Sequence, residues 1–250
     1  MFDPQRPTLK SRLKSGPCLG VFWLALGSVA LVEAAARARP DAIVIDMQHG
    51  LWDRVSLELA IGVVPSEIPV IVRVAENTAL AIGGALDAGA EGVMVPMIDT
   101  AAEAARTVAL AKYPPHGIRS AGGVRPLRDF AAYMKGAEAL AVMVMIETVE
   151  GLAQAPSIAA VPGLDMVFIG TGDLALTLQI GEGDAARHAA ACTDIQRACE
   201  AAALPCGIFT GDGQAAMDAR AAGYGMVVMA TDIDLAVRGF NGARARFAEA

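Results

Sequence analysis

Polar side chains follow several short apolar runs of this sequence, at the point where each run ends. They come from the runs IVIDMQHG, VIVRVAEN, VMVMIETVEG and MVFIGTGDLAL, and they are Asp46, Gln48, His49, Arg73, Glu147 and Asp173, with Gly170 and Gly172 beside Asp173 in the last run. Two carboxylates with open positions between them form a hard oxygen site that suits Mg²⁺ or Mn²⁺. No second histidine follows such a run, which disfavours zinc. The pattern therefore predicts a divalent metal held by Glu147 and Asp173, with His49 and Arg73 beside it.

Each of these residues also has a structural interpretation. An acid at the start of a helix, as Asp173 would be, is commonly an N-cap. Arg73 could be a salt-bridge partner, and His49 an ordinary loop histidine. The glycines of GTGD lack the rest of a dinucleotide fingerprint, but they would let backbone N–H groups approach a small anion at a helix N-terminus. The combination of residues, rather than any one of them, favours the metal site.

The elements that must position these residues alternate along the whole chain. Short apolar runs predict eight strands over Leu19–Leu24, Ala42–Asp46, Val70–Val74, Gly92–Pro96, Ala141–Ile146, Met166–Gly170, Cys206–Phe209 and Met226–Met229. Amphipathic, Ala-rich segments predict helices over Val29–Arg37, Thr78–Ala88, Ala101–Ala111, Ala185–Ala203 and Gln214–Ala222. We expect one (β/α)8 TIM barrel across residues 1–250, with a doubly wound open sheet as the alternative. The chemistry of such a barrel gathers at the C-terminal ends of its strands.

Composition excludes several classes of protein. Hydrophobic residues make up 54% of the chain and aromatic residues 5%, which suits a parallel sheet buried under helices. The apolar stretch Val21–Val32 is too short for a membrane span of about 20 residues, and the N-terminal leader has no apolar core behind its charges. A net charge of −7 argues against a nucleic-acid partner. The cysteines show no metal-like spacing, and Cys192 and Cys199 are predicted to be buried free thiols in a reducing cytoplasm.

The segment from Lys112 to Ala139 interrupts the repeat. It contains KYPPHGIRSAGGVRPLRDF, which is rich in Pro, Gly and Arg and shows no strand-like period. Connections of this length are often functional. Two interpretations remain open, a lid and a subunit contact.

Lysine is missing from the predicted rim. An aldolase can activate a ketone through a lysine Schiff base or through a metal. The lysines are Lys10, Lys14, Lys112 and Lys135, and none follows a predicted strand. The Schiff-base route therefore has no candidate residue, whereas the metal route has one.

The chain resembles the class II (metal-dependent) pyruvate aldolases of the hydroxy-oxo-heptanedioate aldolase family, relatives of the citrate lyase β-subunit group. The likeness spans nearly the whole sequence. It is carried by DMQHG (46–50), RVAEN (73–77), LDAGAEGVMVPM (86–97), KYPPHGIRS (112–120), MIET (145–148) and VPGLDMVFIGTGDLAL (161–176).

This resemblance implies a ligand set and a substrate site. Glu147 and Asp173 match the ligands of a divalent metal, Mg²⁺ or Mn²⁺ with Co²⁺ also possible. Water and the oxygens of the substrate would fill the other positions. Gly172 and Asp173 match the backbone donors to the pyruvate carboxylate, and Gly170 and Thr171 belong to the same turn.

It also implies catalytic roles. His49 matches the general base, and Asp87 matches the acid that raises its basicity. Arg73 matches the residue that stabilises the enolate oxygen, and Asp46 belongs to the same catalytic group. Trp23 resembles the residue that forms one wall of the aldehyde pocket in the family.

Two positions depart from the family pattern. Relatives often carry Glu where this chain has Gln48, so one negative charge near the metal is absent. Relatives often carry Gln where this chain has Met145, so one contact to the substrate would be lost. The common GPADL is GTGDL here, which leaves Asp173 in place.

The expected reaction is aldol cleavage and condensation of 4-hydroxy-2-oxo acids. It would give pyruvate, or a related 2-oxo acid such as hydroxypyruvate, and an aldehyde through a metal-stabilised enolate. Oxaloacetate decarboxylation and cleavage of a CoA thioester are alternatives that use the same site. A CoA substrate would need a basic groove, for which Arg119, Arg125 and Arg128 are the local candidates. A non-catalytic binding barrel would require the polar rim to be coincidental.

The family likeness further implies a homo-oligomer, a hexamer built as a trimer of dimers. The dimers would exchange their last helix, here Asp234–Ala248. The sequence itself shows only that the chain ends in an amphipathic helix rich in Ala and Arg.

Overall fold

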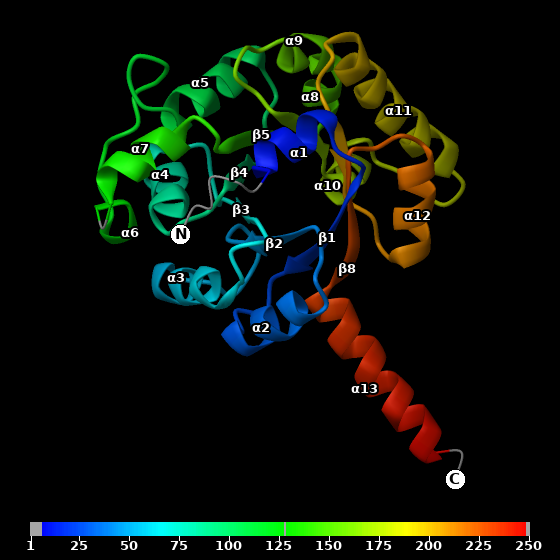
Figure 1. Cartoon of the computed structure of the whole chain (residues 1–250). Helices are drawn as coiled ribbons and strands as arrows, with labels where there is room; N and C mark the ends of the chain where they lie inside the picture. The colour runs from blue at the N-terminus through cyan, green and yellow to red at the C-terminus, as the bar shows by residue number, and fades with distance from the viewer. Residues whose placement is uncertain (1–6, 128, 249–250) are drawn as a thin grey trace.

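Eight parallel strands close into a barrel in the computed structural model, which describes residues 7–127 and 129–248 (Figure 1). The strands pair in chain order, and the last one returns to pair with the first. They are β1 (Leu19–Leu24), β2 (Ala42–Asp46), β3 (Val70–Arg73), β4 (Gly92–Val95), β5 (Ala141–Ile146), β6 (Met166–Ile169), β7 (Cys206–Ile208) and β8 (Met226–Thr231). The predicted (β/α)8 barrel is confirmed, and the open sheet is wrong because this sheet has no free edge.

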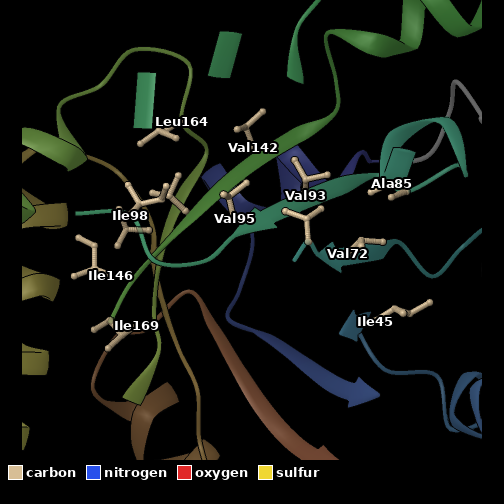
Figure 2. Close-up of a cluster of buried hydrophobic side chains, with 14 of the residues drawn as sticks. Ile45, Val72, Ala85, Val93, Val95, Ile98, Val142, Ile146, Leu164 and Ile169 are labelled. Atoms are coloured by element: carbon tan, nitrogen blue, oxygen red, sulfur yellow. The ribbon is translucent and has the colours of Figure 1, made fainter. Parts of the chain in front are cut away.

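Both faces of the barrel wall are buried, which explains why the strands are continuous apolar runs. Side chains such as Val44, Ile71 and Phe168 point inward and form one cluster inside the barrel. Their neighbours point outward into a second cluster under the helices. Figure 2 shows part of this outer cluster, with Val72 and Val93 near Ala85 of helix α4 (Ala79–Asp87).

The helices return the chain from the C-terminal end of one strand to the N-terminal end of the next. Besides α4 they include α2 (Val29–Arg37), α3 (Arg54–Val63), α5 (Ala101–Ala111), α8 (Val149–Ala153), α9 (Ala155–Ala159), α10 (Thr171–Thr177), α11 (Ala185–Ala201) and α12 (Gly213–Ala221). Most begin at a polar N-cap, as Ser28, Thr78 and Thr100 each accept the backbone N–H three residues on. These caps start the helices immediately after the loops of one rim.

A short helix that the sequence did not predict closes the opposite end of the barrel. In α1 (Leu9–Ser15), Leu9 and Leu13 are one turn apart and buried in the inner cluster. Leu9 lies against Gly92, the first residue of β4, where an added Cβ would come 2.9 Å from its side chain. The segment taken for a leader therefore plugs the N-terminal end of the barrel.

The long segment that begins at Lys112 also lies at this N-terminal end. It follows α5, which has already carried the chain away from the rim, and it contains α6 (Val124–Leu127) and α7 (Phe130–Ala137). Lys112 Nζ donates to the carbonyls of Glu138 at 3.2 Å and Leu140 at 3.1 Å, which ties the two ends of the segment together. A lid over the rim of the same chain is therefore wrong, and a subunit contact stays a prediction.

The last helix, α13 (Asp232–Ala248), extends away from the barrel (Figure 1). It begins two residues before the predicted Asp234, because Thr231 caps its first turn: Thr231 Oγ1 accepts the N–H of Asp234 at 3.0 Å. One stripe of α13 exposes large apolar side chains: Ile233 45%, Val237 51%, Phe240 77% and Phe247 83% exposed. The exchange of this helix between subunits stays a prediction.

Two further features bear on the predicted class. Cys192, Cys199 and Cys206 are buried free thiols, and Cys18 is a partly buried one. No helix in the described part of the chain is long and apolar enough to cross a membrane.

Candidate active site

A buried ion pair joins the ends of β2 and β3. Asp46 and Arg73 are opposite each other in the sheet register. Arg73 Nε donates to Asp46 Oδ1 at 2.9 Å, and its Nη2 donates to Oδ2 at 2.5 Å. A bidentate pair fixes the plane of the guanidinium as well as its position. The salt-bridge interpretation of Arg73 is therefore right, although its charge also acts on Glu147 across the rim.

Asp46 also organises the loop that carries His49. Its Oδ1 accepts the backbone N–H of Gln48 at 3.0 Å and of His49 at 3.2 Å, and its Oδ2 accepts the indole N–H of Trp23 at 3.2 Å. Burial acts to raise the pKa of Asp46, but the hydrogen bonds and charge of Arg73, with those N–H donors, hold it below its ordinary value. Asp46 thus anchors both Arg73 and the loop that carries the exposed His49.

Glu147 follows β5 and is only 1% exposed. Its Oε1 accepts the backbone N–H of Met97 at 2.7 Å. Burial raises the pKa of Glu147 to about 6 and the charge of Asp173 adds to this, while the Met97 N–H and Arg73 act against it. Burial and the neighbouring acid thus disfavour the ionised carboxylate, and a bound cation would relieve that penalty.

Gly170 gives Glu147 its room. A Cβ at Gly170 would lie 2.1 Å from Glu147 Oε2, so a larger residue cannot occupy this position without moving the carboxylate. Gly170 is also the N-cap of α10, where no side chain caps the helix. Thr171, Gly172 and Asp173 then form the first turn, with Asp173 in its third position. The interpretation of Asp173 as an N-cap is therefore wrong.

The first turn of α10 opens toward this carboxylate. Its first helical hydrogen bond runs from the N–H of Leu174 to the carbonyl of Gly170 at 3.0 Å. The N–H groups of Thr171, Gly172 and Asp173 precede that ladder, at the end of a helix where anions bind. The same turn thus offers a carboxylate for a metal and backbone donors for an anion.

The pair Glu147 and Asp173 fits a divalent metal. No three His, Cys, Asp or Glu residues come together as a metal-binding group within residues 7–127 and 129–248. The protein would therefore supply two carboxylates and leave the other positions to water and to an oxygen-bearing substrate, an arrangement typical of Mg²⁺ and Mn²⁺. Burial of Glu147 near the acidic Asp173, which together raise its pKa, is the observation that supports the fit.

Asp87 lies away from this rim. It is the last residue of α4, which starts after β3 at the rim and runs to the opposite end of the barrel. There its Oδ1 accepts a hydrogen bond from Arg119 at 2.7 Å. The structure does not bring Asp87 to His49 within one chain, so the predicted pair would have to form between two copies.

Two of the three arginines suggested for the groove of a CoA substrate also lie away from the rim. Arg119 is 5% exposed and packs against the rings of Tyr113 and Tyr133, at the same distant end as Asp87. Arg125 donates to the carbonyl of Glu58 on α3. Arg128 lies outside the described residues. The structure contradicts this groove for Arg119 and Arg125, because α5 separates their segment from the strand ends.

The predicted substrate contacts lie at different depths. Trp23 is 3% exposed, stacks on Phe168 and carries the Arg73 guanidinium 4.9 Å above its ring. It is thus part of the floor under the ion pair. Met145, 1% exposed, belongs to the same inner cluster, directly below Glu147. Gln48 lies on the rim, and its buried side-chain oxygen has no hydrogen-bond partner among the residues described.

The lysines occupy structural positions. Lys10 Nζ lies 3.2 Å from Asp165, and Lys112 bonds the two carbonyls named above. Lys14 is on α1, at the far end of the barrel. The side chain of Lys135 is outside the described part. None of the lysine side chains that the structure describes reaches the rim, as predicted.

Two contacts at the site were not predicted. The N–H of Met97 binds Glu147 from a loop whose sequence, VPM, carries no polar side chain, so residue types gave no signal. His188 on α11 places Nε2 3.0 Å from the carbonyl oxygen of Thr171. A single histidine in an Ala-rich helix was the available signal, but it follows no strand.

This rim brings together two carboxylates, the free backbone N–H groups of a helix N-terminus and an exposed imidazole, which are groups that enolate chemistry can use. The fold and these groups are consistent with a (β/α)8-barrel lyase. The model of the HpcH/HpaI aldolase/citrate lyase family matches residues 20–238. The chain belongs to this family and is a carbon–carbon lyase.

Similar proteins agree with this class. A hydroxypyruvate/pyruvate aldolase of Paraburkholderia phytofirmans is 38% identical over 244 residues, which cover 90% of this chain and 91% of the relative. A 4-hydroxy-2-oxovalerate aldolase of Rhodococcus jostii is 39% identical over 176 residues, 68% of each chain. The crystal structure of a family protein from Burkholderia cenocepacia has a TM-score of 0.90 at 32% identity and covers 96% of this chain and 98% of its own.

Proposed function

We propose that this protein is a divalent-metal-dependent aldolase that forms and cleaves 4-hydroxy-2-oxo acids. Pyruvate or hydroxypyruvate would be the 2-oxo acid, and an aldehyde the second product. The observation that carries the proposal is the buried carboxylate of Glu147, which faces the charges of Asp173 and Arg73 with its pKa raised to about 6. The relatives named hydroxypyruvate/pyruvate aldolase and 4-hydroxy-2-oxovalerate aldolase support the substrate class.

Glu147 and Asp173 would hold Mg²⁺ or Mn²⁺, with Co²⁺ as a third candidate. When bound, the cation would act as a Lewis acid on the keto group and make the C3 proton of the substrate more acidic. Glu147 is prepared for this role because the Met97 N–H fixes Oε1, while the missing side chain of Gly170 leaves space at Oε2.

The first turn of α10 would bind the carboxylate of the 2-oxo acid. The N–H groups of Gly172 and Asp173 lie at the positive end of the helix, where an anion is favoured. An ideal Cβ at Gly172 would meet no heavy atom within 4 Å, so the space above this turn is open to a ligand. Gly170 and Thr171 shape the turn without contributing a charge.

Arg73 would stabilise the charge of the enolate, and His49 would transfer the proton. Asp46 fixes the Arg73 guanidinium in advance, so its positive charge is in place where the enolate oxygen develops. His49 is the exposed imidazole on the rim and would remove the C3 proton and return it. Asp87 would raise the basicity of His49 only if it comes from a second copy.

The remaining predicted contacts would bound the substrate site. Trp23 and Met145, which belong to the buried cluster inside the barrel, would form its apolar floor. Gln48 would present its side-chain oxygen to the polar groups of the substrate, because this oxygen is buried and no partner for it occurs in the described chain.

Exchange of the C3 protons of pyruvate for deuterium tests this proposal without knowledge of the aldehyde. We expect exchange with Mg²⁺ or Mn²⁺, none with EDTA, and none in Glu147→Ala or Asp173→Ala. Glu150→Ala is the matched control, since Glu150 is an exposed acid three residues beyond Glu147. Exchange that EDTA does not affect would refute the metal, and the absence of exchange under all conditions would refute the enolate.

A substrate panel then separates the reactions. Aldehydes offered with pyruvate and with hydroxypyruvate should give 4-hydroxy-2-oxo acids, and the reverse reaction should cleave them. Oxaloacetate and malyl-CoA serve as comparison substrates. Faster turnover of either would replace the aldolase by a decarboxylase or a CoA-thioester lyase.

The assembly that fits these features is a homo-hexamer in the cytoplasm, built as a trimer of dimers that exchange α13. The apolar stripe on α13 has the character of a surface covered by a second copy, because large exposed apolar patches mark interaction sites. An oligomer would also be needed for Asp87 to reach His49, because the two residues lie at opposite ends of the barrel in one chain. The buried free thiols suit a reducing compartment.

A further inference from the structure

We propose that His188 is a positioning residue that orients the peptide group through which the substrate carboxylate is bound. This inference rests on the proposed function. It follows from one contact, the 3.0 Å approach of His188 Nε2 to the carbonyl oxygen of Thr171. Because a carbonyl oxygen can only accept, Nε2 carries the proton and donates it.

The carbonyl of Thr171 and the N–H of Gly172 belong to the same peptide unit. That unit is planar, so a bond that holds its oxygen also sets the direction of its N–H. The N–H of Gly172 is one of the two donors assigned to the 2-oxo acid. His188 therefore acts on the substrate site indirectly, through the planar peptide unit between Thr171 and Gly172.

This turn needs an external anchor. Thr171 lies between Gly170 and Gly172, and glycines leave the backbone unusually free. Gly170, the N-cap, provides no side-chain hydrogen bond to the helix. Two contacts hold the turn instead: the hydroxyl of Thr171 donates to the carbonyl of Phe209 at 3.1 Å, and His188 binds the Thr171 carbonyl.

The bond also changes the strength of the donor. A hydrogen bond accepted by a peptide carbonyl polarises the amide, which strengthens its N–H by about 10–30% in condensed phase. Orientation and polarisation act in the same direction, toward tighter binding of the carboxylate. The loss of His188 should therefore weaken substrate binding more than it slows the chemical step.

His188 is not needed to attach its helix to the barrel. α11 is held by buried residues in its later turns, among them Ile195 and Cys199, whereas His188 is partly exposed in the early part of the helix. A variant at this position should remain folded, so its effect on binding can be measured.

The test compares His188→Ala with His188→Gln, whose side-chain amide nitrogen can reach the place of Nε2. The pyruvate dependence of metal-dependent C3 exchange gives KM and kcat. We expect His188→Ala to raise KM on the order of tenfold, the factor for loss of one ordinary hydrogen bond, with kcat changed by less than about threefold. His188→Gln should return KM to within about threefold of wild type. His116→Ala, at an exposed histidine beyond α5, should change neither.

Calorimetric titration of pyruvate into the Mg²⁺-loaded protein gives the same comparison as a Kd. A Kd or KM that His188→Ala leaves unchanged, or that His188→Gln fails to restore, would overturn the role of His188. If thermal melting shows that His188→Ala does not fold, His188→Gln decides alone, and a tenfold rise in its Kd overturns the inference. Failure of the proposed function looks different: wild type would bind pyruvate without exchange. If wild type binds no pyruvate at all, both proposals fall.

Discussion

Removal of the charge of Glu147 from the metal-free protein should stabilise the fold at neutral pH. Glu147→Gln keeps an oxygen that can accept the Met97 N–H, now at 2.7 Å, and deletes only the charge. The pKa of Glu147 is raised from 4.5 to about 6, by burial first and with a contribution from Asp173. At about 1.4 kcal/mol per pH unit, this corresponds to roughly 2 kcal/mol.

The direction of the pH dependence follows from the same pKa. The folded-state value lies above the unfolded-state value, so ionisation of Glu147 costs stability. The cost is absent below about pH 4.5 and complete above about pH 6. Asp46 acts in the opposite sense at lower pH, since its pKa is held below its ordinary value and its contribution is lost only when the pH falls through that lowered value. The two effects therefore occupy different pH ranges.

Thermal melting in EDTA measures the difference. For a chain of this size, 2 kcal/mol should raise the Tm of Glu147→Gln above wild type by about 4–8 °C near pH 7.5, with a smaller gap near pH 5. Mg²⁺ should stabilise wild type but not the variant. Glu150→Gln, the exposed neighbour, should melt like wild type at both pH values. A variant that melts below wild type near pH 7.5, or a gap that does not depend on pH, would refute the reasoning.

Three further changes test other parts of the molecule. Gly170→Ala should abolish Mn²⁺ binding in a calorimetric titration, because the new Cβ would lie 2.1 Å from Glu147 Oε2. Gly172→Ala, which has open space around its Cβ, should still bind Mn²⁺. Equal binding by both variants would contradict the geometry. Asp46→Asn should slow C3 exchange about 10²–10³-fold, because the guanidinium that it anchors loses its fixed position, and a rate near wild type would rule out that role. Phe240→Asp should lower the oligomeric mass measured by light scattering, since it puts a charge into the apolar stripe of α13, and an unchanged mass would exclude the stripe as a contact.

Much of the fold and half of the site could be predicted from local patterns. Apolar runs buried on both faces mark parallel strands, and the C-terminal ends of such strands meet on one rim. Asp46, Arg73 and Glu147 were found by that rule alone. Helix α1 was missed because two leucines among basic residues resemble a charged leader. Only the open end of a barrel makes Leu9 and Leu13 a plug.

Asp87 shows what a motif leaves out: the sequence does not say which chain supplies a residue. The sequence LDAGA suggested a role beside His49, yet Asp87 ends a helix that starts at the rim. The last residue of such a helix must lie at the opposite end of the barrel, so topology alone separates the two residues within one chain. Met97 illustrates a different limit, because a backbone N–H has no residue type and becomes a ligand of Glu147 only through the path of the loop.

The arrangement of charged residues at the rim favours the binding of a divalent cation. The positive charge of Arg73 acts on Glu147, and it could pair with that carboxylate if it were free to turn toward it. Asp46 prevents this by binding both Nε and Nη2 of Arg73. Glu147 and Asp173 then keep their negative charges, and burial together with Asp173 raises the pKa of Glu147 against the opposing effects of the Met97 N–H and Arg73. If this account is right, Asp46→Asn should weaken Mn²⁺ binding as well as catalysis, because a released Arg73 would compete with the metal for Glu147.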